Sequence, residues 1–180
     1  MRCPGCGSHL SFDDSTSVVE CPQCHRHICR LGAVKETTKV VFFQGTFDGI
    51  NAGHIRAIQA IAKLGRLVIG LNSDSLINWM IGHGDKSQPQ LILPFVQRKE
   101  VFEGIKGVDE VIEVHEPSAL RYLQQLKADI YVLTEEWAIS QLEAIKWIEA
   151  NGGQVVFSPR YSDIYCNSDI RRRIIEGAGE

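Results

Sequence analysis

The chain has 180 residues, of which 44% are hydrophobic and 23% charged, a size that suits one globular domain with a small appended segment. Its net charge of −3 excludes a whole-protein basic field of the kind that attracts nucleic acid or an anionic membrane. No apolar run approaches the ~20 residues of a membrane span and no signal peptide is visible, so we expect a cytoplasmic protein with reduced thiols.

Two cysteine pairs open the chain, Cys3 with Cys6 and Cys21 with Cys24. Their C-x2-C-x14-C-x2-C spacing suits four thiolates around one tetrahedral metal ion, and it resembles a zinc ribbon. We therefore expect a structural Zn²⁺ that supplies the folding energy of a segment too short to bury a core of its own. Four neighbouring side chains are alternative ligands, namely His9, His25, His27 and Cys29.

The ribbon and its linker are expected to occupy residues 1–36, and the main domain residues 37–180. A short hairpin is predicted around residues 13–17, because apolar residues flank them at Leu10, Phe12, Val18 and Val19. Acidic and basic residues balance within the ribbon, which disfavours a nucleic-acid contact. We expect the ribbon to act as a structural cap or to contact a partner protein.

From residue 39 onward, short apolar stretches alternate with amphipathic ones. The expected strands are 39–44, 66–71, 110–114, 129–133 and 154–157. The expected helices are 53–64, 73–81, 94–105, 117–126, 139–150 and 167–176. This alternation predicts an α/β fold, a Rossmann-like parallel sheet of five strands with helices on both faces. Ligands of such sheets bind beyond the carboxyl ends of the strands.

The first strand runs into a glycine-led turn, Gly45 to His54, which reads G-T-F-D-G-I-N-A-G-H. A helix that begins here points unpaired backbone N–H groups and the positive end of its dipole at the turn, as in phosphate sites of α/β proteins. Gly45 lets the backbone approach a ligand, Gly53 opens the helix, and His54 lies in its first turn. Polar segments 134–137 and 158–169 follow other strands, so we expect all three to meet in one cleft.

These features resemble the cytidylyltransferase-like nucleotidyltransferases over residues 39–176, most closely the glycerol-3-phosphate cytidylyltransferases and to a lesser degree the heptose-phosphate adenylyltransferases. The motif G-T-F-D…H-x-G-H of that family stands here as G-T-F-D…N-A-G-H. The other matching positions are Arg98 in the third helix, V-D-E-V-I at 108–112, T-E-E-W at 134–137 for G-D-D-W, and Pro159-Arg160 with 166–169 for P-R-x-x-x-I-S-T-T.

The resemblance implies transfer of CMP from CTP to a small phosphorylated acceptor, a polyol or sugar phosphate, with release of pyrophosphate and with Mg²⁺ travelling with the nucleotide. The implied catalytic residues are His54, Asn51 and Lys86. The implied nucleotide and phosphate ligands are Gly45, Thr46, Phe47, Asp48, Gly53, Arg98, Glu136, Arg160 and Ser168. Two roles stay open for Asp48, which could position a metal or the acceptor, or only brace the loop.

The chain also departs from the family pattern. Asn51 stands where the first histidine is usual, and an amide can donate a hydrogen bond but carries no charge. Losing one such donor costs on the order of 10²–10³ in rate. Asn167 and Asp169 replace hydroxyl residues. These departures leave open a new acceptor, a slower enzyme, or a non-catalytic nucleotide-binding module whose ribbon docks a partner. The resemblance also leaves open an adenylyltransferase that uses ATP. A homodimer is a further expectation from the resemblance.

Overall fold

The structure is a computed structural model that describes residues 3, 6–10, 18–25, 27–29, 38–83, 91–158 and 167–177, without the side chains of 18, 27–29, 168, 169 and 171. Lys86, Arg160 and the hairpin expected at 13–17 lie outside the described residues, as does most of the expected linker. Among the described residues, none of the helices combines the length and the apolar character that crossing a bilayer requires.

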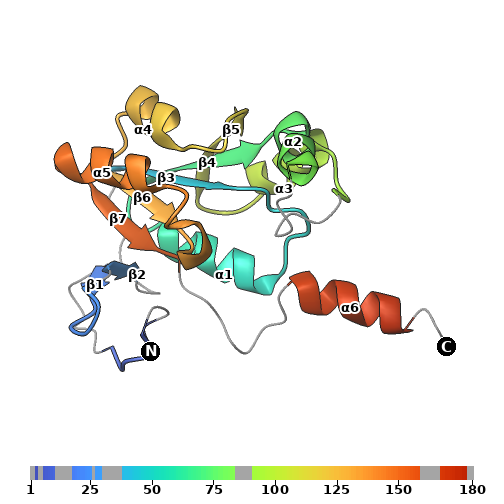
Figure 1. The fold of residues 1–180 in the computed structure, drawn as a ribbon, viewed down its shortest axis with the longest axis horizontal. Coiled ribbons are helices and arrows are strands. Elements are labelled where there is room, and N and C mark those ends of the chain that lie inside the picture. Colours follow the sequence, from blue (N-terminus) through green and yellow to red (C-terminus); the bar gives the residue numbers. More distant parts are fainter. Residues whose placement is uncertain are drawn as a thin grey trace.

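Five parallel strands form the centre of the molecule, in the order β7-β6-β3-β4-β5 (Figure 1). They are β3 (Val40–Gly45), β4 (Arg66–Asn72), β5 (Val108–Val114), β6 (Ile130–Leu133) and β7 (Gln154–Phe157). All five coincide with predicted strands, so the predicted Rossmann-like α/β fold is confirmed. The prediction succeeds because β3, β4, β6 and β7 are short apolar runs between helices, whereas β5 mixes apolar and acidic residues.

The sheet continues beyond these five strands into the cysteine-rich segment. β1 (Val18–Glu20) pairs antiparallel with β2 (His27–Cys29), and β2 pairs in parallel with β7, which makes a sheet of seven strands. His27 lies opposite Val156 and Ile28 opposite Phe157. The sequence did not predict this extension, because three-residue strands are too short to show an alternating pattern. The ribbon is thus joined to the edge of the main sheet.

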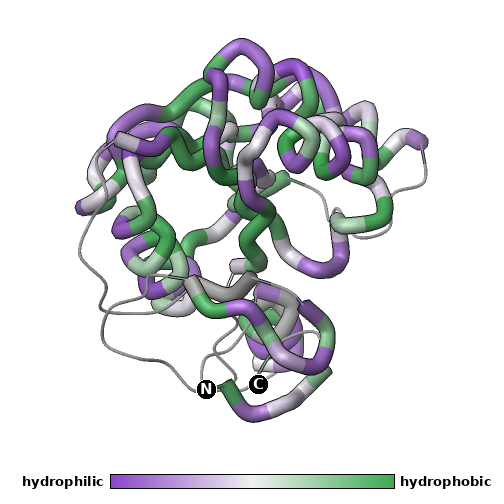
Figure 2. Tube along the Cα trace, turned by 90° about the vertical axis from the view of Figure 1, so that its left-hand side faces the viewer, coloured by the Kyte–Doolittle hydropathy of each residue, from purple (hydrophilic) through white to green (hydrophobic). Residues whose placement is uncertain are grey.

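Helices cover both faces of the sheet. They are α1 (Ala52–Ile61), α2 (Asp74–Gly82), α3 (Phe95–Glu103), α4 (Leu120–Leu126), the 3₁₀ turn η1 (Glu135–Trp137), α5 (Leu142–Ala150) and α6 (Asn167–Gly177). Successive residues of β3 face opposite ways, so Val41 and Phe43 pack with α1 and α3, and Phe42 packs with α2, α4 and α5. The strands are mostly hydrophobic, with hydrophilic stretches on the outer turns (Figure 2). α6 projects away from the sheet (Figure 1).

Two helices, α4 and α5, begin three residues later than the sequence predicted. α4 starts at Leu120 and not at Pro117, because a buried side chain from beyond β6 occupies its entry. Gln141 Nε2 donates to the Pro117 carbonyl at 2.8 Å, and Gln141 Oε1 accepts the Ala119 N–H at 2.9 Å. These two bonds fix the loop between β5 and α4, which forms part of the site described next.

Candidate functional site

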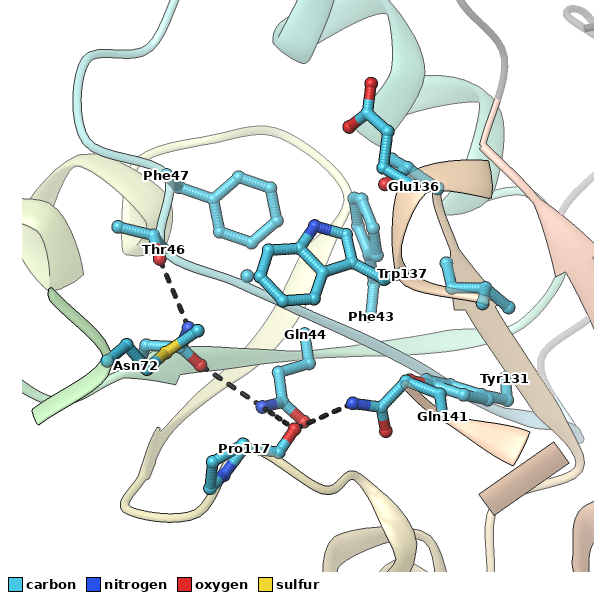
Figure 3. Close-up of a pocket in the computed structure, with 14 residues that line it drawn as sticks. Phe43, Gln44, Thr46, Phe47, Asn72, Pro117, Tyr131, Glu136, Trp137 and Gln141 are labelled. Atoms are coloured by element: carbon cyan, nitrogen blue, oxygen red, sulfur yellow. Dashed lines mark hydrogen bonds between the residues drawn. The ribbon is translucent and has the colours of Figure 1, made fainter. Parts of the chain in front are cut away.

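A cavity of about 220 Å³ lies at the carboxyl ends of the central strands. β3 has β4 on one side and β6 on the other, so the strand order reverses here, and such switch points are where α/β sheets bind ligands. The lining comes from the ends of β3, β4 and β6, from η1 and from the β5–α4 loop (Figure 3). Two of the three polar segments predicted to converge, 45–54 and 134–137, meet at this place.

The turn after β3 is shaped by an aromatic ring. Phe47 has a left-handed backbone with φ of 49°, which is uncommon for a residue with a side chain. Its ring packs on Phe43 and Phe102 at centroid distances of 5.1 and 4.9 Å, and its edge faces His54 at 6.3 Å. A Cβ on Gly45 would lie 2.7 Å from this ring. Glycine is therefore required at 45 by Phe47 itself, in addition to any ligand.

The first turn of α1 is capped by a side chain. Asn51 is the N-cap residue, and its Oδ1 accepts the N–H groups of Gly53 at 2.9 Å and His54 at 3.2 Å. The helix therefore begins at Ala52, one residue before the predicted start. Two of the N–H groups that we expected to be unpaired therefore donate to Asn51. A bound phosphate would have to compete with the Asn51 oxygen for these donors.

The capping also fixes the tautomer of the neutral His54 ring. Its Nδ1 accepts the Asn51 backbone N–H at 3.2 Å, so the neutral ring carries its proton on Nε2. Burial lowers the pKa of His54 below the ordinary 6.5, since a charged imidazolium loses hydration there. Near neutral pH the ring is thus a neutral Nε2–H donor beside the turn.

Two residues that depart from the family pattern contact each other. Asn51 Nδ2 donates to Asn167 Oδ1 at 2.9 Å, and Asn167 Nδ2 donates to the carbonyls of Asp48 and Gly49 at 3.0 and 2.7 Å. Asn167 therefore ties the start of α6 to the turn after β3. The sequence showed each departure separately but not that they form a pair.

Asp48 faces the protein and not the cavity. Only 8% of the residue is exposed, and its carboxylate accepts the N–H groups of Ile92 at 2.8 Å and Leu93 at 2.9 Å. Of the two roles left open by the sequence, this is the geometry of the loop brace.

Arg98 is buried, with 1% of the residue exposed. Its guanidinium donates to the carbonyls of Leu93, Thr46 and Asn72 at 2.8–2.9 Å and to the Asp74 carboxylate at 2.6 Å. These bonds hold the turn after β3 against the end of β4. The geometry gives Arg98 a positioning role at the site, through the Thr46 carbonyl.

The remaining predicted residues are distributed as follows. Thr46 and Glu136 line the cavity, and Thr46 Oγ1 accepts from Asn72 Nδ2 at 3.2 Å. Ser168 lies in the first turn of α6, and its side chain is not among those described. Three amide side chains of the lining were not predicted from the sequence, those of Gln44, Asn72 and Gln141. The available signal for Gln44 and Asn72 was a polar residue at the carboxyl end of an apolar strand.

The four N-terminal cysteines form a second site. Their sulfur atoms all lie within 4.8 Å of one another, with 3.5 Å from Cys3 to Cys24 and 3.6 Å from Cys6 to Cys21. Four sulfurs at the usual zinc–sulfur bond length are separated by roughly 3.8 Å in a tetrahedron. The cluster therefore fits a metal ion such as zinc, as predicted.

The hydroxyl of Ser8 supports this cluster. Its Oγ lies 3.1 Å from the sulfurs of both Cys6 and Cys21. Hydrogen bonding from Ser8 is the main cause that lowers the pKa of Cys21 to about 6, and it also lowers the pKa of Cys6. Among the alternative ligands, His25 is engaged with Glu20 at 2.7 Å. The thiolate form is the one that binds metal, so Ser8 favours metal binding.

A Rossmann-like sheet with a cavity at its switch point, and with a histidine in the first turn of the helix that follows its central strand, is typical of α/β proteins that bind nucleotides. The chain belongs to the cytidylyltransferase-like family, whose model matches residues 42–158.

Known proteins agree with this assignment. The bifunctional protein HldE of Hahella chejuensis is 34% identical over 118 residues, which are 65% of this chain and 24% of that protein. HldE of Gluconobacter oxydans is 30% identical over 154 residues, 85% of this chain and 29% of that protein. The chain thus matches only 24–29% of the length of these relatives. A crystal structure of the lipopolysaccharide core biosynthesis protein from Thermoplasma volcanium matches with a TM-score of 0.55 and 25% identity, covering 69% of this chain and 98% of that one.

Proposed function

We propose that the chain transfers a nucleotidyl group from a nucleoside triphosphate to a small sugar or polyol phosphate. The observation that carries this proposal is the convergence of the β3, β4 and β6 ends on one cavity, with the His54 ring packed against Phe47, a residue of the cavity lining. Both CTP and ATP are candidate donors. The likeness that favoured CTP lies in residues 134–160, whose last two residues are outside the described part of the chain.

The chemistry needs one bond made and one broken. A phosphate oxygen of the acceptor attacks the α-phosphorus of the triphosphate, the bond from that phosphorus to the bridging oxygen breaks, and pyrophosphate leaves with the electron pair. The protein positions both anions and stabilises the charge that develops on oxygen. Mg²⁺ bound to the triphosphate would neutralise part of that charge.

The residues would share this work as follows. His54 would donate from Nε2 to a phosphate oxygen, and the Thr46 and Phe47 backbone would lie against the α-phosphate. To contact the phosphate, Asn51 would give up its bonds to the N–H groups of Gly53 and His54. These N–H groups are the ones that favour an anion at a helix start. Arg98 would keep the turn after β3 in place through its hydrogen bond to the Thr46 carbonyl.

The test is pyrophosphate release from CTP or ATP with Mg²⁺ and a panel of sugar and polyol phosphates. We expect release with one donor, and a decrease of about 10²–10³ in kcat for His54→Ala. His115→Ala is the matched control, because this imidazole is exposed and is not among the residues that line the cavity. Tight nucleotide binding without pyrophosphate from any acceptor would contradict the proposal and support the non-catalytic module.

We also propose that the four-cysteine cluster binds structural zinc, about one ion per chain. Cys21→Ser should lose the metal and the amide hydrogen-exchange protection of β1 and β2, because the ribbon has little apolar core of its own. Cys166→Ser, remote in sequence from the pairs, is the control. A metal-free protein that keeps the same protection would contradict this part.

A further inference from the structure

The cavity at the end of β3 is lined almost wholly by neutral groups. Among the described residues that line it, Glu136 is the one of a charged type. Burial raises the pKa of Tyr131, so this phenol stays protonated at neutral pH. A phosphate is bound by cations and backbone N–H donors, and a carboxylate repels it. The cavity therefore suits an uncharged part of a substrate.

One wall of the cavity carries a relay of amides. Gln44 Nε2 donates to Asn72 Oδ1 at 3.2 Å, and Asn72 Nδ2 donates to Thr46 Oγ1 at 3.2 Å (Figure 3). Gln44 Oε1 is buried and accepts no hydrogen bond from the described part of the chain. A buried acceptor without a donor is unfavourable. A ligand hydroxyl in the cavity is the kind of donor that this acceptor lacks.

The other side of the cavity is flat and apolar. Figure 3 shows the Trp137 indole and the Phe47 ring on the side away from Pro117, and Met80 and Leu133 also belong to the lining. An aromatic wall beside amides that both donate and accept matches a ring that has C–H faces and hydroxyl edges. The volume of about 220 Å³ is below the roughly 300–1,000 Å³ of drug-sized sites, so it suits one ring and not a whole nucleotide.

We propose that this cavity binds the hydroxyl-bearing body of the acceptor, a sugar or a polyol, with the acceptor phosphate directed outwards to the turn after β3 and the first turn of α1. This proposal rests on the proposed function. The ribose of the nucleotide is the other source of the same hydroxyl chemistry, and the experiments separate the two.

The first experiment measures binding without turnover. Calorimetry compares glycerol 3-phosphate and glucose 1-phosphate with n-propyl phosphate, which carries the same charge without hydroxyls. We expect the better hydroxylated ligand to bind at least about tenfold more tightly, because a site built to hydrogen-bond hydroxyls rejects an analogue without them. Equal affinities, or no binding of any of the three, would overturn the proposal.

The second experiment uses Gln44→Met, which keeps the side-chain length and removes the amide, and Trp137→Leu. We expect each variant to raise the acceptor KM by about 2- to 10-fold, with the nucleotide Kd unchanged. Gln59→Met, on an exposed position of α1, should change neither. A weaker nucleotide Kd with an unchanged acceptor KM would overturn the acceptor assignment in favour of the ribose.

The two proposals fail differently. If no triphosphate releases pyrophosphate with any acceptor, the proposed function fails, whereas the calorimetric comparison still decides what the cavity binds. Thermal melting of each variant shows whether it folds. If Gln44→Met unfolds, Gln44→Asn, which keeps the amide but shortens it, and Trp137→Leu are measured in its place, and an unchanged affinity in both would overturn the proposal.

Discussion

Replacing Arg98 by methionine tests whether the turn after β3 is held by a buried guanidinium. Methionine keeps the apolar stem and removes four hydrogen bonds, three to carbonyls and one to Asp74. A buried acceptor that loses its donor costs about 1–3 kcal/mol, and removing one partner of a buried ion pair costs about 3–5 kcal/mol. Solvent reduces the cost of leaving Asp74 without its partner, because 39% of its side chain is exposed.

We therefore expect Arg98→Met to lower the free energy of unfolding by about 3–5 kcal/mol. For a chain of this size, each kcal/mol corresponds to about 2–4 °C in Tm, so the Tm should fall by roughly 6–20 °C. The assay is urea unfolding followed by circular dichroism, in which the midpoint should fall while the slope m stays constant.

The control is Arg66→Met, in an ion pair with Glu110 in which both side chains are about half exposed. Exposed pairs contribute about 0–1 kcal/mol, so this variant should remain close to the wild type. If Arg98→Met is no more destabilising than Arg66→Met, the reasoning is wrong. If Arg98→Lys is as stable as the wild type, the charge matters and the planar fork does not.

Three more changes test the same region. Gly45→Ala should destabilise the fold by about 1–3 kcal/mol, because the added methyl group would overlap the Phe47 ring. Gly82→Ala should stabilise the fold by up to about 1 kcal/mol, because nothing lies within 4 Å of its Cβ. Similar urea-unfolding midpoints for the two variants would contradict this. A double-mutant cycle of Asn51→Ser and Asn167→Ala should give a coupling of about 0.5–1.5 kcal/mol in urea unfolding, and additivity would show that the amide pair contributes nothing. Because burial lowers the pKa of His54, the unfolded state takes up a proton more readily than the folded state, so the free energy of unfolding should fall as the pH drops below about 6.5 towards the lower folded pKa. Calorimetric Tm values should decrease more between pH 7.5 and 5.5 for the wild type than for His54→Gln. Equal decreases in the two proteins would refute this reasoning.

The strands and most helices were predictable because their signals are local. Four of the five central strands are apolar runs such as Lys39–Gln44, and α2 begins after Ser73, whose side chain caps it. The turn after β3 was predictable for the same reason, since glycine, a first-turn histidine and a preceding strand lie within a few positions.

The roles inside the site depended on contacts that sequence cannot place. Arg98 matched a family position, but whether its guanidinium faces a ligand or the protein is decided by Asp74 and three carbonyls from separate segments. Gln44 and Gln141 both donate to the Pro117 carbonyl, although Gln44 lies in β3 and Gln141 at the start of α5. Such convergence follows from the strand order, which no single segment encodes.

The pairing of β2 with β7 has a consequence for how the chain folds. During synthesis the cysteine-rich segment leaves the ribosome before the main domain, and its sheet partner β7 emerges only after β3, β4, β5 and β6. Contacts between distant parts of a chain form slowly, since the chain loses entropy on closing a long loop before the contacts can stabilise it. A bound metal ion would keep the early segment folded during this wait, ready to complete the last edge of the sheet.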